Sequence, residues 1–280
     1  MERIGVIGAG TMGHGIAQVC AMAGYAVTLT DARQDSLDAA MAKIGANLDK
    51  GVARGKVSPE ERDQALAGLA TGDLAAASEG ASFVIEAVPE RLELKQSLLR
   101  AVADIAPAEC VLATNTSSLS IATIAASVED PGRVIGTHFF NPVHIMKLLE
   151  VVVGADTRDT VVQRVRDLGA NIGKEVIIVR DVPGFATSRL GVCLGMEAIR
   201  MVEQGVASPE DIDKAMVLGY RHPVGPLRLT DMVGLDVRMA IGSYLARELN
   251  NAAFEPPALM RQMVEDGRLG KKAGRGFYEW

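Results

Sequence analysis

The sequence predicts an α/β protein in which a doubly wound, mostly parallel β-sheet is followed by an all-helical domain. Three observations support this fold class. A glycine-rich turn joins the first apolar run to an amphipathic one, short apolar runs then alternate with helical periods as far as residue 179, and only helical periods remain beyond residue 185. We therefore expect a sheet domain over residues 1–182 and a helical domain over residues 183–280.

The glycine-rich turn follows the first predicted strand, which begins at Arg3. Gly8, Gly10 and Gly13 have the spacing G-x-G-x-x-G, and a strand-like run over residues 25–30 completes a βαβ unit. In a Rossmann-type dinucleotide site the first glycine permits the tight turn, the second lets a pyrophosphate approach, and the third lets the helix pack on the strand. The turn's predicted cofactor-binding residues are Gly8, Ala9, Gly10, Thr11, Met12 and Gly13.

Asp31 predicts which dinucleotide binds. It ends the second strand, 18 residues after Gly13, and a carboxylate at about this spacing accepts hydrogen bonds from the ribose hydroxyls of NAD. A 2′-phosphate would bring its charge against Asp31, so we predict NAD as the cofactor. Arg33 lies two residues further on and can offset part of that repulsion, so the expected preference over NADP is one of degree.

The remaining elements follow from the spacing of apolar residues. A capping box, Ser58-Pro59-Glu60-Glu61, opens one further helix. The sheet domain is predicted to have helices over 36–57, 92–105 and 160–168 and strands over 83–88, 110–114, 133–137, 147–153 and 175–179. In the C-terminal part we expect helices over 186–203, 208–218 and 226–249, rich enough in apolar residues to predict a homodimer through this domain. The alternative is that they pack against the first domain alone.

Composition limits the class of protein. The chain has 280 residues and a formal net charge of −6, which argues against binding to nucleic acid or to a membrane surface. The first strand begins too early for a signal peptide, and no apolar stretch approaches the length of a membrane span. The cysteines are predicted to be buried free thiols in a reducing compartment, and they are Cys20, Cys110 and Cys193. We therefore expect a cytoplasmic protein.

A histidine and a glutamate stand out in the middle of the chain. His138 ends one predicted strand, and Glu150 lies inside the apolar strand that follows. If the two strands form a hairpin turning near His144, their even separation places both side chains on one face, within about 5 Å. A carboxylate there fixes the tautomer of the imidazole and stabilises the imidazolium, which suits a general base for alcohol–ketone interconversion.

A buried pair that only stabilises the fold is the alternative, because an unpaired buried carboxylate is costly. The other histidines show no metal-binding spacing with any cysteine or acid, so we predict no metal. They are His14, His144 and His222.

Five segments carry a family resemblance. They are Gly8-Ala9-Gly10-Thr11-Met12-Gly13, Asn115-Thr116-Ser117-Ser118-Leu119, Thr137-His138-Phe139-Phe140-Asn141-Pro142, His222-Pro223-Val224-Gly225-Pro226 and Lys271-Lys272-Ala273-Gly274-Arg275-Gly276-Phe277-Tyr278. With them the sequence resembles the 3-hydroxyacyl-CoA dehydrogenase family from Arg3 to Tyr278. The resemblance implies an NAD-dependent enzyme that interconverts an (S)-3-hydroxyacyl-CoA, expected to be short-chain such as 3-hydroxybutyryl-CoA, and the 3-oxoacyl-CoA.

The resemblance also implies roles for individual residues. His138 corresponds to the family's catalytic base, Glu150 to the glutamate that orients it, and Ser117 to the serine that hydrogen-bonds the substrate hydroxyl near the nicotinamide. Further cofactor contacts are implied at Asp31, Glu90, Lys95, Ser117, Asn141 and Lys272. Substrate contacts are implied at Asn47, Arg54, Ser117 and Asn141, with Lys50 as an additional basic candidate for coenzyme A. A solvated helix face is the alternative for Asn47, Lys50 and Arg54.

One position departs from the family pattern. The family's P-G-F-x-x-N-R carries an asparagine where this chain has Ser188. A serine has a shorter reach and one proton to give, but a water can bridge the difference, so we keep Ser188 as a catalytic candidate. Two other functions remain open: a dehydrogenase of a free hydroxy acid on the same fold, and a non-catalytic NAD-binding or structural protein.

Overall fold

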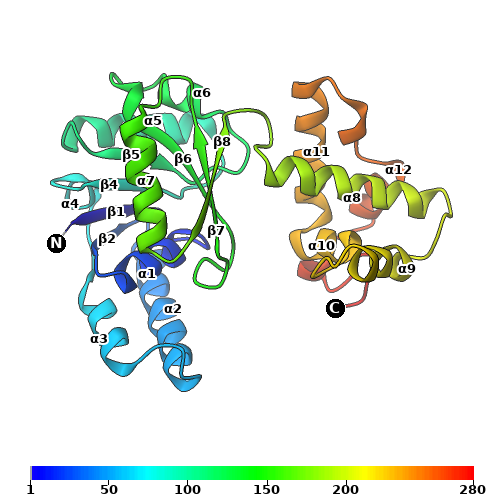
Figure 1. Ribbon diagram of the computed structural model, residues 1–280, viewed down its shortest axis with the longest axis horizontal. Coiled ribbons are helices and arrows are strands. Elements are labelled where there is room, and N and C mark those ends of the chain that lie inside the picture. The colour runs from blue at the N-terminus through cyan, green and yellow to red at the C-terminus, as the bar shows by residue number, and fades with distance from the viewer. Residues whose placement is uncertain (1) are drawn as a thin grey trace. The chain divides into compact units, whose positions relative to one another are not determined.

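An eight-stranded sheet, in the order β3-β2-β1-β4-β5-β6-β7-β8, forms the centre of the N-terminal unit (Figure 1). The computed structural model describes residues 2–280, and its contacts divide the chain into the units Met1–Asp181 and Val182–Trp280. The strands are β1 (Arg3–Ile7), β2 (Ala26–Thr30), β3 (Leu69–Thr71), β4 (Phe83–Glu86), β5 (Val111–Thr114), β6 (Val134–Phe139), β7 (Leu148–Val153) and β8 (Glu175–Arg180).

Neighbouring strands run parallel except β6 and β7, which form an antiparallel pair. The strand order changes direction between β1 and β4. In an open parallel sheet such a switch point leaves a crevice at the carboxyl ends of the strands, where ligands bind. The turns that follow β1, β4 and β5 are therefore the ones that position a site.

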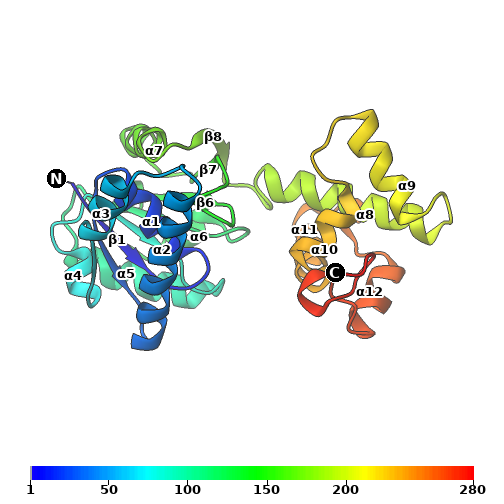
Figure 2. The ribbon, with the colours of Figure 1, turned by 90° about the horizontal axis from the view of Figure 1, so that it is seen from below.

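Helices cover both faces of this sheet (Figures 1 and 2). The apolar residues of α1 (Gly13–Met22), α2 (Gln34–Ala53) and α7 (Asp159–Asn171) share one core with Ile4 and Val6 of β1. On the other face, α4 (Leu74–Ser78), α5 (Leu92–Ile105) and α6 (Ile121–Ala125) follow one another in contact. Gly5 and Gly136 face α4 and α6 closely, because a β-carbon on either would meet Ala77 or Ile121. The helix α3 (Pro59–Ala67) packs on α1 and α2.

The second unit is helical and has its own core. It contains α8 (Thr187–Glu203), α9 (Pro209–Lys214), a π-helical turn (Ala215–Gly219), α10 (Pro226–Val233), α11 (Leu235–Leu249) and α12 (Ala258–Glu265). The buried carboxylate of Asp231 anchors the end of the chain: it accepts hydrogen bonds from the amides of Phe277 and Tyr278 and from the indole of Trp280. This unit therefore closes on its own C-terminal segment.

The predicted fold class is confirmed, and so is the capping box, in which the Ser58 hydroxyl accepts from the Glu61 amide and Glu61 accepts from the Ser58 amide. The single helix predicted over 226–249 is wrong, because Gly234, at φ 106°, separates α10 from α11. Strand 83–88 ends at Glu86 and helix 36–57 ends at Ala53. The short elements β3 and α4, and α12, were not predicted.

Candidate active site

The turn after β1 forms an open cradle of backbone amides. Gly8 has φ 98°, and a β-carbon on Gly13 would lie 1.6 Å from the Gly8 carbonyl oxygen, so helix and strand meet at contact distance. A β-carbon on Gly10, by contrast, would meet nothing within 4 Å. Within residues 2–280, the amides of Gly10, Thr11, Met12 and Gly13 donate to no acceptor. Free amides around an unfilled space at a helix start fit a pyrophosphate.

Asp31, at the end of β2, lies beside this cradle. Its Oδ2 accepts from the Ala9 amide at 2.7 Å, and its Oδ1 accepts from the Arg33 amide at 3.1 Å. The Arg33 guanidinium is paired with Asp35 through Nε at 3.0 Å. Arg33, which could offset the repulsion between Asp31 and a 2′-phosphate, therefore already has a carboxylate partner. This favours the predicted preference for NAD over NADP.

A buried ion pair lies where β4 ends. Lys95 of α5 and Glu86 are both fully buried, and Lys95 Nζ lies 2.7 and 3.0 Å from the two Glu86 oxygens. The Thr114 hydroxyl donates to the same carboxylate at 2.6 Å. Lys95 thus lies beneath the strand ends, and a direct cofactor contact by it stays a prediction. Sequence reasoning missed Glu86, although an acid in an apolar run was the signal that singled out Glu150.

Glu90 holds the Asn115–Ser118 turn that follows β5. Its Oε1 accepts from the Thr116 hydroxyl at 2.6 Å and from the Ser117 amide at 2.8 Å, and its Oε2 lies 3.4 Å from Lys95 Nζ. Burial raises the pKa of Glu90, but the Lys95 charge and these hydrogen bonds together lower it below its ordinary value. An ionised Glu90 therefore fixes the backbone that carries Ser117.

His138 and Glu150 are direct partners across the antiparallel pair β6–β7, as predicted. The His138 Nδ1 lies 2.8 Å from Glu150 Oε2, and both residues are buried. Because a carboxylate only accepts, the proton lies on Nδ1, and Nε2 is the basic nitrogen of the neutral ring. The Phe139 amide donates to Asn115 Oδ1 at 2.9 Å, which ties the end of β6 to the turn of Ser117. Their catalytic roles stay predictions.

The other predicted residues lie further along the chain. Asn141 is an exposed residue of the β6–β7 connection. In the second unit, Ser188 lies on the first turn of α8, and Lys272 Nζ donates to Asp236 Oδ2 at 2.6 Å. The roles of these three residues stay predictions.

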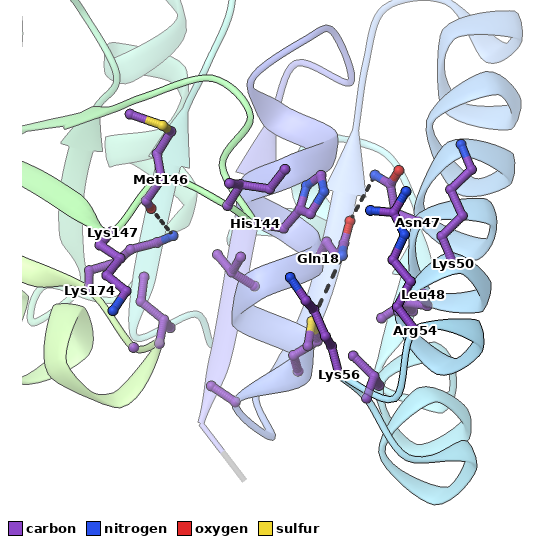
Figure 3. A pocket seen from close by; sticks show the side chains of 18 of the residues that line it. Gln18, Asn47, Leu48, Lys50, Arg54, Lys56, His144, Met146, Lys147 and Lys174 are labelled. Atoms are coloured by element: carbon purple, nitrogen blue, oxygen red, sulfur yellow. Dashed lines mark hydrogen bonds between the residues drawn. The ribbon is translucent and has the colours of Figure 1, made fainter. Parts of the chain in front are cut away.

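A cavity of about 630 Å³ lies between α1, α2 and two turns of the same unit (Figure 3). Asn47 and Lys50 of α2 line it with Arg54, the residue that follows this helix, and the Asn47 amide donates to Gln18 at 3.2 Å. Lys147 and Lys174 line it from the opposite side, where Lys174 Nζ donates to the Met146 carbonyl at 2.7 Å. None of the residues lining it is acidic. Sequence reasoning found the helical wall and missed the other, because that wall comes from turns without periodicity.

The part of the chain that the structure covers, residues 2–280, contains no group of three or more histidine, cysteine or acidic side chains able to hold a metal ion. No helix in that range combines the length and the apolarity needed to cross a membrane.

The fold and the site together define an NAD-dependent dehydrogenase with a two-unit architecture. Comparison with known families identifies the particular dehydrogenase family. Residues 3–182 match the NAD binding domain of 3-hydroxyacyl-CoA dehydrogenase, and residues 184–280 match the C-terminal domain of the same enzyme. The chain belongs to the 3-hydroxyacyl-CoA dehydrogenase family.

Individual relatives match over the whole chain. A 3-hydroxybutyryl-CoA dehydrogenase from Mycobacterium tuberculosis is 43% identical over 286 residues, covering 100% of this chain and 99% of the relative. The crystal structure of (S)-3-hydroxybutyryl-CoA dehydrogenase from Ralstonia eutropha is 38% identical with a TM-score of 0.96, covering 100% and 99% of the two chains. A 3-hydroxyadipyl-CoA dehydrogenase from Escherichia coli is 41% identical, and this chain spans 59% of its length.

Proposed function

We propose that this protein uses NAD to interconvert a short-chain (S)-3-hydroxyacyl-CoA, such as 3-hydroxybutyryl-CoA, and the corresponding 3-oxoacyl-CoA. The observation that carries the proposal is the 2.8 Å contact between His138 and Glu150, joined through Asn115 to the Ser117 turn. The names of the relatives support the substrate class.

The chain's own residues handle the proton. In the oxidation direction His138 Nε2 takes the proton from the C3 hydroxyl, and Glu150 stabilises the imidazolium that forms. Ser117 hydrogen-bonds the same hydroxyl from the turn that Glu90 holds. NAD, when bound, accepts the hydride that leaves C3.

The cofactor is held by the cradle described above. The backbone amides of the cradle would donate to the pyrophosphate. The Asp31 carboxylate would accept from the adenosine ribose hydroxyls with the lone pairs that are not used by the Ala9 and Arg33 amides. We keep Glu90, Lys95, Asn141 and Lys272 as proposed further cofactor contacts.

The basic cavity supports the proposal that the substrate is bound through its coenzyme A moiety. Coenzyme A carries phosphates at its nucleotide end, and the cavity offers five basic side chains with no acid beside them. Asn47 and Lys50 of α2 and Arg54, at the C-terminal end of this helix, are the proposed contacts. Lys147 directly precedes β7 and lies three residues before Glu150, roughly 10 Å along an extended chain. An extended pantetheine arm spans such a distance, so the phosphates and the thioester can occupy the cavity and the His138 site at once.

We also propose a cytoplasmic homodimer formed through the helical unit. Several large apolar side chains of this unit are exposed, and exposed apolar surface is what protein–protein interfaces bury. They are Leu190, Val206, Leu218, Tyr220, Met232, Val233 and Val237. Sedimentation equilibrium of the full chain tests this proposal, and a single monomeric species contradicts it.

The function is tested by comparing acetoacetyl-CoA with free acetoacetate, each with NADH. We expect rapid NADH oxidation with the thioester and little with the free acid. The reverse preference identifies a dehydrogenase of free hydroxy acids. An absence of turnover with both substrates, while NADH still binds, identifies a non-catalytic protein.

A further inference from the structure

The imidazole of His14 contacts the glycine turn from inside the protein. His14 is the second residue of α1 and is only 6% exposed, and its Nδ1 lies 2.8 Å from the Gly10 carbonyl oxygen. Because a carbonyl only accepts, Nδ1 carries the proton and donates. Among the described residues 2–280, the only other donor to this carbonyl is the His14 amide at 3.3 Å, beyond the usual range for a strong N–H···O bond. The imidazole is therefore the main restraint on the Gly10 carbonyl.

This restraint fixes the orientation of a neighbouring amide. In a planar trans peptide the C=O and the N–H point in opposite directions. A Gly10 carbonyl held toward α1 therefore directs the Thr11 N–H away from the helix, on the exposed side of the turn. The Thr11 amide donates to no acceptor within residues 2–280. His14 thus holds one donor of the cradle in place before any ligand arrives.

We propose that His14 is a positioning residue for the dinucleotide: its Nδ1–H holds the Gly10–Thr11 peptide so that the Thr11 amide is presented to the pyrophosphate. A donor already held in its bound orientation loses less freedom on binding, which strengthens binding without a further contact. His14 itself need not touch the cofactor. This inference rests on NAD binding by the glycine turn and is independent of the acyl-CoA substrate.

Three variants distinguish the effect of the His14–Gly10 hydrogen bond on dinucleotide binding from the effect of packing around α1. His14→Ala removes the donor. His14→Asn keeps an N–H donor at the same number of bonds from the α-carbon, within reach of the carbonyl four residues earlier. Cys20→Ala is the matched control, because it also truncates a fully buried side chain on the same helix. The readouts are the Kd for NADH from fluorescence titration and the Kd for ADP-ribose from calorimetry, both without acyl-CoA.

We expect His14→Ala to raise both Kd values about fivefold, the worth of one neutral hydrogen bond. His14→Asn and Cys20→Ala are expected to stay within about twofold of the unmodified protein. Unchanged binding in His14→Ala overturns the proposal. The proposal is also overturned if His14→Asn binds both ligands as weakly as His14→Ala, or if Cys20→Ala raises the Kd values equally. Either result attributes the weaker binding to the packing of α1.

Discussion

The proposed chemistry depends most directly on the imidazole of His138. We expect His138→Gln to lower turnover of acetoacetyl-CoA by about a hundredfold to ten-thousandfold, because it removes the group that donates the proton in reduction and accepts it in oxidation. NADH affinity is expected to stay nearly unchanged, since the glycine turn is intact. Initial rates and a fluorescence titration on the same preparation measure the two effects. Loss of NADH binding with turnover retained contradicts the assignment.

Ser188 gives a second test at the level of one side chain. If its hydroxyl supports the substrate, directly or through a water, Ser188→Ala should lower kcat/KM by about tenfold or less, the worth of a neutral hydrogen bond. Ser188→Asn restores the family residue and is expected to be tolerated, because the longer amide reaches the position of the water. Full activity in Ser188→Ala removes Ser188 from the site.

Single residues also show what sequence alone can predict. The pairing of His138 with Glu150 was predictable because strand neighbours follow from an even separation across a short turn. The bond between His14 and Gly10 was not, because an N–H donor on a buried helix face carries no periodic signal. Glu86 was within reach of the same reasoning as Glu150, since both are acids in apolar runs.

Lys50 of helix α2 is a proposed contact for the nucleotide end of the substrate. We expect Lys50→Ala to raise the KM for acetoacetyl-CoA about tenfold, because a charge-assisted contact to a phosphate is lost. The KM for acetoacetyl-pantetheine, which lacks the nucleotide, is expected to stay unchanged. Steady-state kinetics with both thioesters makes the comparison.

Lys214→Ala serves as the control for this prediction, because Lys214 is an exposed lysine that lines no part of the cavity. An equal rise in KM for both thioesters in Lys50→Ala assigns Lys50 to the fold rather than to coenzyme A.

Elements were predicted best where periodicity and capping agree. Helix α5 begins and ends at the predicted residues, Leu92 and Ile105. The break between α10 and α11 was missed because apolar residues continue across Gly234, and only its left-handed backbone reveals the turn. Strand β3 and helix α4 have three and five residues, too few for a period to show. Such short elements are determined by their packing on the sheet rather than by a local sequence pattern.

At the scale of the whole molecule, stability should depend on pH through His14. Burial lowers the pKa of His14 below its ordinary 6.5; the bond to Gly10 raises it and nearby Lys43 lowers it further. The pKa of His144, in the β6–β7 connection, is lowered by burial and lowered further by the charge of His14. The folded protein thus binds this proton less readily than the unfolded chain does, so stability is lost as pH falls below about 6.5.

Urea unfolding at pH 7.5 and pH 5.5 measures this loss. We expect His14→Asn to lose less stability between the two pH values than the unmodified protein, because the asparagine does not titrate. The effect of Glu90 belongs to a different range, since its lowered pKa matters only below its ordinary value of 4.5. The same loss in both proteins contradicts a contribution from His14.

The antiparallel pair β6–β7 also bears on the order in which the chain folds. It joins His138 to Glu150 across a short connection, whereas β1 and β4 must bring Ile4 to Phe83 across a long crossover. Closing a short loop costs less chain entropy, and hairpins form within about 10 μs. The base and its carboxylate can therefore meet while the first strand is still unpaired. The His138–Glu150 pair belongs to the most local strand pairing of the sheet, and the β1–β4 pairing beside the cofactor cradle is the most distant.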